Sequence, residues 1–358
     1  MMKKTALVLL IAVLALFMVP YGASAGDKIV RLKMPSAIPT KLPLMENLHW
    51  FAKQVELITN GSVLIKIYEP GALVPPFEIQ EAVSAAQVEA GWSGTIYMSG
   101  KMPAASLFTS MPFGPNVTEF FGWYYFGNGT KLMQEMYDTN GFNVKVWPML
   151  FIPTESGGWF NKKVESVEDF KGMRLRWPGL GGKVLSKLGA SVSTIPGGEI
   201  FPALEKGALD GSEFSNPILD NALGFWKVAK YNYFPGWHQT CTAMEFMINK
   251  KVWAAMSPTE QAAIETAIMA SNLRGVALVE AGVGKILKAN KEERGVQNML
   301  YSKATLLALR ATWEEVAKEE SAKDAFFKKV YDDLTAFMND YQIWECHSYP
   351  ALPMECDY

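Results

Sequence analysis

The feature of this sequence that most constrains its fold is a repeated alternation of strand-like and helix-like segments. Apolar residues recur at every second position in the strand-like segments and with a helical period between them. In the first series, strands are expected at residues 29–35, 62–68 and 88–93, and helices at 44–57 and 77–88. Strands that alternate with helices favour a parallel sheet. This series therefore predicts one α/β unit.

A second series of the same kind occupies the centre of the chain. Its strands are expected at residues 157–161, 173–177, 191–195 and 209–214, and its helices at residues 183–188 and 200–206. The simplest interpretation is a second α/β unit.

The last third of the chain is mainly helical. A strand is expected at residues 242–249, and Pro258 suits the first turn of a helix. Residues 260–290 contain no proline and keep helical spacing, and residues 304–341 continue as helices. A long helix after two α/β units would suit a spine that spans two lobes, followed by C-terminal helices.

The first 25 residues have the pattern of a secretory signal peptide. Lys3 and Lys4 precede an apolar run at residues 6–19, and Ala25 ends a small-residue cleavage site. We therefore expect a soluble exported protein that starts near Gly26. The remaining chain divides into lobe I, lobe II and C-terminal helices with a tail. Their expected bounds are 26–150 (completed by about 242–285), 151–241 and 286–358.

Charge and cysteine content exclude several function classes. The chain has 34 basic and 36 acidic residues, and loss of the signal peptide lowers the formal net charge from −2 to −4. This argues against a nucleic-acid-binding protein, which usually has a basic surface. Three cysteines are too few for a disulfide scaffold. Cys346 and Cys356 either pair with each other or remain two thiols.

Two glycine-rich segments and the histidines do not predict a site. Residues 179–183 resemble a phosphate-binding loop, but the flanking positions hold Trp177 and Val184 instead of glycine and serine or threonine. Residues 91–94 lack the spacing of a nucleophile elbow. The three histidines are too scattered along the chain to suggest a site, and they are His49, His238 and His347.

Arginine is the more informative residue type. Only six of the basic residues are arginine, and Arg174 and Arg176 share one face of an expected strand. Arg176 lies at the carboxyl end of that strand, where open α/β sheets bind ligands. A guanidinium binds a carboxylate through two parallel hydrogen bonds, which lysine does not match. The alternative is a surface arginine that pairs with an acid.

Two carboxylates and many aromatic residues complete the pattern. Asp210 and Glu213 flank the end of another expected strand, where a carboxylate is usually a cap or part of a solvated pair. If both reached the same crevice as Arg176, they would indicate a bound cation. Most aromatic side chains belong in the core, but a few in a cleft would shield a small anion from water and strengthen its ion pairs.

Residues 171–178 and 198–213 resemble the substrate-binding receptors of tripartite ATP-independent periplasmic (TRAP) transporters, and the resemblance covers essentially the whole mature chain. Further segments are similar to the branch that binds 2-oxo acids or lactate together with a metal ion. These segments are Gly71–Pro75, Pro112–Gly114, Gly157–Phe160 and Tyr233–Trp237. The resemblance implies a two-lobed fold of the periplasmic-binding-protein type.

The resemblance also implies roles for individual residues. Arg176 matches the arginine that holds the ligand carboxylate, and Tyr97 matches a tyrosine that contacts it. The implied substrate-binding residues are Arg176, Tyr97, Phe214 and Glu155. The implied ligands of the cation are Glu155, Glu213, Gln239 and the backbone carbonyl of Phe214.

Three positions depart from the pattern of the branch. Glu155 stands where glutamine is usual, Ile152 where asparagine often contacts the ligand, and Phe214 where tryptophan is common. Glu155 adds a negative charge, so charge counting favours Ca²⁺ over Na⁺. The alternative is that Glu155 is protonated or turned to solvent.

We therefore expect a periplasmic receptor, not an enzyme. It would capture a small 2-oxo or 2-hydroxy monocarboxylate with a calcium or sodium ion and deliver it to integral-membrane subunits of a transporter. The resemblance also implies a homodimer through the C-terminal helices. The alternatives are a secreted enzyme that acts on carboxylates, which would need a nucleophile–base pair or an open metal site, and a sensor subunit that signals to a membrane kinase.

Overall fold

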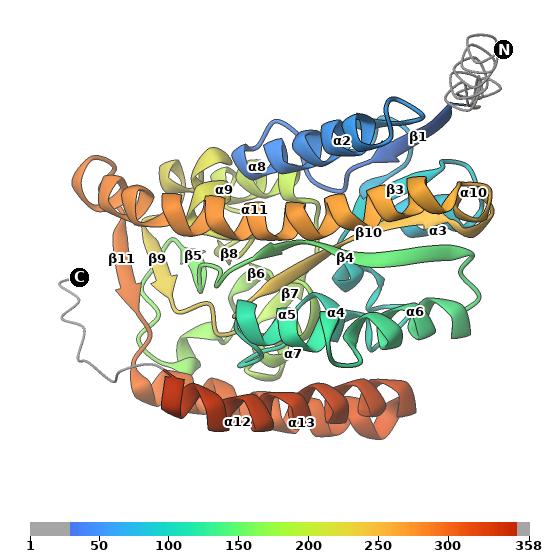
Figure 1. Ribbon diagram of the computed structural model, residues 1–358. Helices are drawn as coiled ribbons and strands as arrows, with labels where there is room; N and C mark the ends of the chain where they lie inside the picture. The colour runs from blue at the N-terminus through green and yellow to red at the C-terminus, as the bar shows by residue number, and fades with distance from the viewer. Residues whose placement is uncertain (1–28, 349–358) are drawn as a thin grey trace, which may run out of the picture.

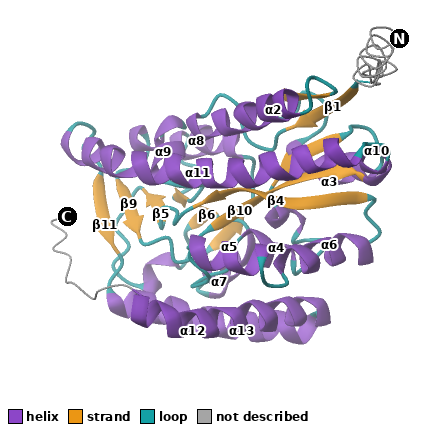
Figure 2. Ribbon diagram, in the orientation of Figure 1, coloured by secondary structure: helices purple, strands orange, loops and turns teal. Residues whose placement is uncertain are grey.

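The computed structural model describes residues 29–348 (Figure 1). The expected signal peptide, its cleavage site at Ala25 and the tail residue Cys356 lie outside the described residues. Within residues 29–348, helices and strands form layers in which sheets lie between helical covers (Figure 2). The α/β class expected from the sequence is confirmed.

The first half of the fold contains two small sheets. Strands β1 (Val30–Pro35) and β2 (Val63–Tyr68) are parallel. A three-stranded sheet has the order β3 (Ala90–Ser93), β10 (Thr242–Asn249) and β4 (Val144–Ile152). Strand β10 is antiparallel to both neighbours, so the expectation of a purely parallel sheet is wrong here. The reason is that β10 returns from the second half of the chain and enters between two strands of the first half.

A six-stranded sheet forms the second half, in the order β11-β9-β5-β8-β6-β7. The strands are β5 (Gly158–Phe160), β6 (Arg174–Arg176), β7 (Ser191–Ser193), β8 (Gly211–Ser212), β9 (Tyr231–Phe234) and β11 (Gln297–Leu300). Strand β6 is parallel to β7 and β8, and β9 is parallel to β11. Strand β5 is antiparallel to β8 and β9, so this sheet is mixed.

The helices of the first half cover its sheets. They are α2 (Glu46–Ile58), α3 (Ile79–Ser84), α4 (Ala105–Thr109), α5 (Val117–Tyr125) and α6 (Gly129–Thr139). The expected helix at residues 77–88 ends earlier, at Ser84, because Ala86 has a left-handed φ of 59°. Helix α5 begins with a capping box, in which the Asn116 side chain accepts from the backbone of Glu119 and the Glu119 side chain accepts from that of Asn116.

The second half of the fold contains three short helices. The helices are α7 (Gly179–Lys187), α8 (Gly197–Glu205) and α9 (Pro217–Ala222). Gly207 has φ 65° just after α8, as expected of a C-cap glycine. Five 3-10 segments complete the fold at Pro43–Met45, Pro76–Glu78, Thr95–Met98, Val167–Phe170 and Phe225–Lys227.

The long helix expected as a spine is α11 (Pro258–Glu292), which follows the short α10 (Lys250–Ala254). The side chain of Ser257 caps α11 and accepts from the backbone of Glu260. By length and composition, α11 would be apolar enough to cross a membrane. In the structure it packs against α2 and β4 at one end and against α9 and β11 at the other, so it runs along both halves (Figure 1).

The chain ends in a helical pair, α12 (Lys303–Lys323) and α13 (Ala325–Ser348). The pair confirms the helices expected at residues 304–341, with a single extended residue, Asp324, between them. Helix α12 packs on α7 of the second half, whereas α13 packs on α4, α5 and α6 of the first half. The pair therefore contacts both halves on the side opposite to α11 (Figure 1).

A carboxyl group lies in the core of the first half. Glu245 of β10 is fully buried and accepts hydrogen bonds from Gln80 Nε2 at 2.9 Å and from the Tyr137 hydroxyl at 2.8 Å. Burial raises the pKa of Glu245 from 4.5 to about 7. The stability that this group contributes is complete below its unfolded pKa and is lost as the pH rises through 7.

We therefore expect Glu245→Gln to flatten the pH dependence of stability. Between pH 5 and pH 8 the wild-type free energy of unfolding should fall by about 2 kcal/mol more than that of the variant. Denaturant unfolding at several pH values measures this difference, with Glu205→Gln at an exposed carboxyl as the control. Parallel curves for the wild type and Glu245→Gln would contradict the prediction.

Candidate functional site

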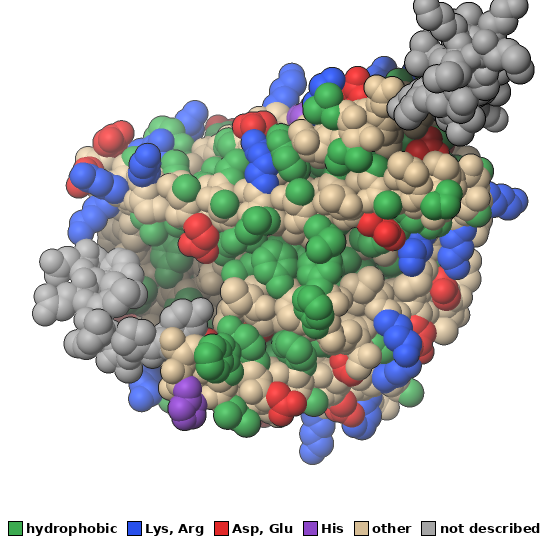
Figure 3. Space-filling model, viewed as in Figure 1, with side chains coloured by type: hydrophobic (Ala, Val, Ile, Leu, Met, Phe, Trp, Pro, Cys, Tyr) green, Lys and Arg blue, Asp and Glu red, His purple; other side chains and the backbone are tan. Residues whose placement is uncertain are grey.

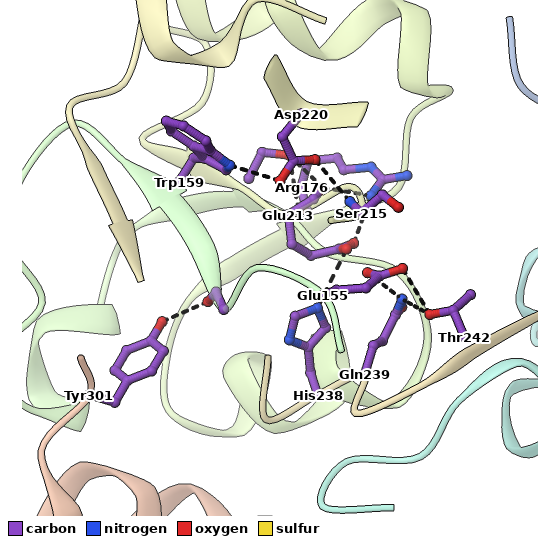
Figure 4. A network of polar contacts seen from close by, with 12 residues as sticks. Glu155, Trp159, Arg176, Glu213, Ser215, Asp220, His238, Gln239, Thr242 and Tyr301 are labelled. Atoms are coloured by element: carbon purple, nitrogen blue, oxygen red, sulfur yellow. Dashed lines mark hydrogen bonds and ion pairs between the residues drawn. The ribbon is translucent and has the colours of Figure 1, made fainter. Parts of the chain in front are cut away.

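The chain crosses three times between the three-stranded and the six-stranded sheet, once through helices α10 and α11 and twice through short segments. The crossing segments are residues 153–157, from β4 to β5, and residues 235–241, from β9 to β10. They lie side by side, because the backbone N–H of Glu155 donates to the carbonyl of Gln239 at 3.2 Å. The crossing segments thus bring Glu155 and Gln239 together between the sheets (Figure 4).

Arg176 reaches the same place from the end of β6. Strand β6 is paired with β8 so that Arg176 lies beside Ser212, and Glu213 is the next residue after β8. The Arg176 Nη1 donates to the Glu213 carbonyl at 2.8 Å and to Glu213 Oε1 at 2.7 Å, and Nε donates to the Ile195 carbonyl at 3.2 Å. Both side chains of this ion pair are 1% exposed. Arg176 is therefore a buried cation.

The neighbouring arginine behaves differently. Arg174 has a side chain that is 52% exposed, and it pairs with Asp210 at 2.8 Å on the surface. The alternative to a ligand-binding arginine was a surface arginine that pairs with an acid. This alternative describes Arg174 but not Arg176. Asp210 does not converge with Glu213 on the crevice of Arg176.

Glu155 is buried, with 2% of its surface exposed. Its Oε2 accepts from Gln239 Nε2 at 2.8 Å, and its Oε1 accepts from the Thr242 hydroxyl at 2.8 Å. The alternative that Glu155 turns to solvent is therefore wrong. Burial, together with the nearby Glu213 carboxylate, raises the pKa of Glu155 well above its usual range.

His238 joins this group, contrary to the expectation that the histidines form no site. Its Nε2 lies 3.5 Å from Glu213 Oε2, and the residue is 2% exposed. Its ring lies against Trp177 and Trp237, with ring centroids 4.8 and 5.6 Å away. The sequence signal for His238 is its position between Trp237 and Gln239, a segment that the resemblance already covers.

The predicted site residues line one small cavity. They are Tyr97, Ile152, Glu155, Arg176, Glu213, Phe214 and Gln239. The cavity has a volume of about 30 Å³ for the centres of water-sized molecules. This is enough for roughly two waters, since one water needs at least about 10–15 Å³ by the same measure.

Two aromatic side chains flank the guanidinium group in this cavity. The Phe214 ring centroid lies 5.7 Å from the Arg176 guanidinium carbon, within cation–π range. Tyr97 lies on the 3-10 segment Thr95–Met98 and is half-buried. Burial raises the pKa of Tyr97, and the positive charge of Arg176 opposes this shift. Tyr97 therefore remains a neutral hydrogen-bond donor at physiological pH.

The charges of the cavity fit a metal ion. Glu155, Glu213 and His238 each offer a ligand atom, and these three atoms lie within 4.8 Å of one another. The raised pKa of Glu155 shows the cost of ionising two buried carboxyl groups beside one arginine. With both ionised, an excess of negative charge remains in a site of low dielectric constant. A cation held by the carboxylates would neutralise it.

The family was identified by comparison with known proteins. The DctP family model, "Bacterial extracellular solute-binding protein, family 7", matches residues 36–324. The chain belongs to family 7 of the bacterial extracellular solute-binding proteins. It is also 35% identical over 323 residues to the "Monocarboxylate 2-oxoacid-binding periplasmic protein" of Nostoc sp. PCC 7120, covering 90% of this chain and 88% of that protein.

Crystal structures of TRAP periplasmic solute-binding proteins have the same fold. A TRAP receptor of Bordetella bronchiseptica, with copurified calcium and picolinate, matches with a TM-score of 0.86 and 31% identity, covering 90% of this chain and 95% of that one. A TRAP receptor of Colwellia psychrerythraea, with calcium and pyruvate, has a TM-score of 0.85 and 31% identity over 90% and 98% of the chains. A TRAP receptor of Pseudoalteromonas atlantica, with sodium and pyruvate, has a TM-score of 0.85 and 29% identity, covering 90% of this chain and 100% of that one.

These similarities confirm two predictions made from the sequence. The chain is a TRAP-type solute-binding receptor with the fold of periplasmic binding proteins. Family 7 comprises binding proteins, so the alternative of a secreted enzyme is not supported. Family 7 proteins are extracellular or periplasmic, as expected for this chain.

Asp220 supports the site of this family 7 receptor and was not predicted. It is fully buried at the start of α9 and accepts from Trp159 Nε1 at 2.8 Å and from the backbone N–H of Ser215 at 3.0 Å. It thereby holds the segment that carries Glu213 and Phe214. Burial raises the pKa of Asp220 to about 8. The sequence signal is weak, since an acid in a first helical turn is usually only a favourable charge.

Proposed function

We propose that this receptor binds a small 2-oxo or 2-hydroxy monocarboxylate together with a calcium or sodium ion in the cavity between the crossing segments and Arg176. The observation that carries the proposal is a buried arginine beside two buried carboxylates, Glu155 and Glu213. The arginine would bind an anionic ligand. Because there are two carboxylates for one arginine, the site would also bind a cation. The relative from Nostoc, named for 2-oxoacids, and the neighbours with pyruvate support this pairing.

The proposed contacts follow from the positions of the side chains. Arg176 and Tyr97 would hold the ligand carboxylate, and the Phe214 ring would cover it. Glu155, Glu213, Gln239 and the Phe214 carbonyl would hold the cation, with Glu155 also near the ligand. Ile152 offers no hydrogen bond at its edge of the cavity. The small volume favours a small acid over a sugar acid.

The same proposal extends to the surroundings of the receptor. After cleavage near Ala25, lobe I (26–150 with about 242–285) and lobe II (151–241) would close over the ligand, and the receptor would deliver it to integral-membrane subunits. A homodimer would form through the C-terminal helices of the segment 286–358. Exposed apolar residues of α13 support this interface, with Ile343 at 67% and Trp344 at 62% exposure. Apolar side chains also gather between α11 and the helical pair (Figure 3).

Calorimetry on ligand-free, untagged receptor tests the proposed ligand class. Pyruvate and lactate are titrated in the presence of Ca²⁺ and, separately, of Na⁺, with glucuronate as the larger comparison acid. We expect binding of at least one of the small acids at micromolar concentration or below and no binding of glucuronate. If neither pyruvate nor lactate binds with either cation, the proposed ligand class is wrong.

Ligand binding is expected to reduce the radius of gyration. The cavity in this structure is nearly closed, so a ligand enters only when the sheets separate around the crossing segments. A ligand that contacts both sides favours the closed state. Small-angle scattering with saturating pyruvate and Ca²⁺ measures the change, and Arg176→Lys, which is expected to bind weakly, is the control. Identical profiles with and without ligand would contradict closure.

A further inference from the structure

One outer edge of the six-stranded sheet is open. Strand β11 (Gln297–Leu300) is the last strand on that side, and within residues 29–348 it pairs only with β9. The backbone N–H groups of Gln297 and Tyr301 donate to carbonyls of the β9 side, both at 2.8 Å. Because backbone groups alternate in direction along a strand, the N–H and C=O groups of Asn298 and Leu300 point away from β9. Such an edge can bind another extended segment.

A hollow lies beside this edge. It is lined by Lys288, Lys291 and Glu292 of α11 and by residues 295–299, and its volume is about 680 Å³. Leu300, the next residue of the edge, is 54% exposed. Lys288 lies 3.9 Å from Glu292, and Lys291 has no ion-pair partner in the described part of the chain. The hollow thus combines outward backbone groups, exposed apolar surface and an excess of positive charge.

The last described residue, Ser348, lies close to the same edge. Strand β11 leads into α12, which begins at Lys303. Helix α13 runs back along α12, because the rings of Trp313 and Tyr331 are in contact with centroids 6.1 Å apart. Helices of 21 and 24 residues joined by one residue therefore return the chain past the start of α12, next to the end of β11 (Figure 1).

Ten residues follow Ser348 in the sequence, and we call them the tail (residues 349–358). Pro350 and Pro353 lack an N–H group and suit the approach to an edge better than the pairing itself. Residues 354–358 contain no proline, and their acidic side chains alternate with Met354, Cys356 and Tyr358. Five extended residues span about 16 Å, which is enough for the roughly 13 Å of the four-residue strand β11. The tail has two acids and no lysine or arginine.

We propose that residues 354–358 pair with the open edge of β11 as an antiparallel strand, with Glu355 and Asp357 facing Lys288 and Lys291. The direction is antiparallel because the tail starts beside the end of β11 and has to run back along it. The tail then ties α13, which packs on the first half, to the sheet of the second half, and it closes the edge to other chains. This inference goes beyond the proposed function and does not depend on the ligand or the cation.

Cross-linking in the full chain identifies the occupant of the edge. Leu300→Cys is combined with Cys346→Ser, so that the native thiols left are Cys356 and Cys241, which is buried. With a short bismaleimide, we expect a link between position 300 and Cys356 within one chain. The matched control is Ser191→Cys in place of Leu300→Cys, at an exposed residue of β7 on the opposite edge of the same sheet, and it should give no link.

Two outcomes of the cross-linking would overturn the proposal. The first is no link at position 300, or equal linking at positions 191 and 300. The second is a link only between two chains, which would assign the edge to the tail of a second copy instead of the chain's own tail.

Hydrogen exchange measures the pairing without introduced thiols. A chain truncated after Ser348 should exchange the amide hydrogens of residues 298–300 at least about tenfold faster than the full chain, with β7 unchanged. Lys291→Glu in the full chain should act in the same direction because it brings like charges together. Lys285→Glu, at an exposed lysine of α11 outside the hollow, should not. Unchanged exchange at residues 298–300 in a truncated chain with the circular dichroism of the folded protein would disprove the pairing, whatever the result for pyruvate.

Discussion

Replacement of Arg176 by lysine is expected to weaken pyruvate binding at least 100-fold. The guanidinium makes three hydrogen bonds, one from Nε to Ile195 and two from Nη1 to Glu213, which leaves the two N–H groups of Nη2 for the ligand carboxylate. Lysine offers a single point of charge and leaves some of these partners unsatisfied. Loss of one partner of a buried ion pair typically costs about 3–5 kcal/mol, which includes the cost of the stranded anion.

The same strand supplies the matched control. Arg174→Lys changes an exposed arginine that pairs with Asp210, two residues from Arg176. We expect this variant to bind pyruvate as the wild type does in calorimetry. Thermal unfolding of both variants separates loss of binding from loss of folding. Wild-type affinity in a folded Arg176→Lys variant would rule out Arg176 as the ligand clamp.

Removal of the cation is expected to have an effect of similar size. Glu155, Glu213 and the ligand carboxylate bring three negative charges, and Arg176 balances only one of them. The remaining charge is buried, and uncompensated buried charge costs several kcal/mol, so affinity should fall at least about 100-fold after chelation. A divalent ion balances both remaining charges, whereas a monovalent ion balances one. Ca²⁺ should therefore restore affinity more fully than Na⁺.

A substitution at Glu155 tests the charge argument directly. Glu155→Gln removes one negative charge and keeps the size of the side chain, so the variant should respond to Na⁺ more and to Ca²⁺ less than the wild type. Glu245→Gln, at a buried carboxyl in the core of the first half, is the matched control and should leave the cation preference unchanged. Full affinity in chelator without added cation would remove the cation from the mechanism, and recovery with Na⁺ alone would disprove only the preference for a divalent ion.

The sequence predicted the elements whose apolar pattern is local. The alternation in β1, β2 and β10 and the proline that begins α11 are visible within a few residues. The direction of β10 is not visible, because it depends on where the chain goes between residues 153 and 241. Strand β4 (Val144–Ile152) lacks a distinct alternation, since nearly all of its residues are buried. The helical spacing of the buried residues of α6, by contrast, was visible in the sequence and was not predicted.

Local sequence patterns also did not distinguish the residues of the site from their neighbours. Arg174 and Arg176 have equivalent places in the strand pattern, yet one is exposed and the other is buried. The difference arises because the crossing segments and Phe214 cover only the end of β6. The place of Arg176 at the carboxyl end of the strand and the resemblance to known receptors distinguished it from Arg174, whereas the alternation within the strand did not. His238 was missed because its partner, Glu213, is distant in sequence and near only in the fold.

The crossing segments have an evolutionary consequence. Glu155 and Gln239 belong to the short stretches that join the two sheets, so under the proposed function a mutation there would alter both the ligand shell and the hinge between the sheets. Tyr97, Ile152 and Phe214 line the cavity outside these stretches. Receptors with new specificities should therefore differ mainly at these three cavity residues, whereas the residues of the crossing segments should change little. A saturation library should yield receptors with altered selectivity mostly from those three wall positions.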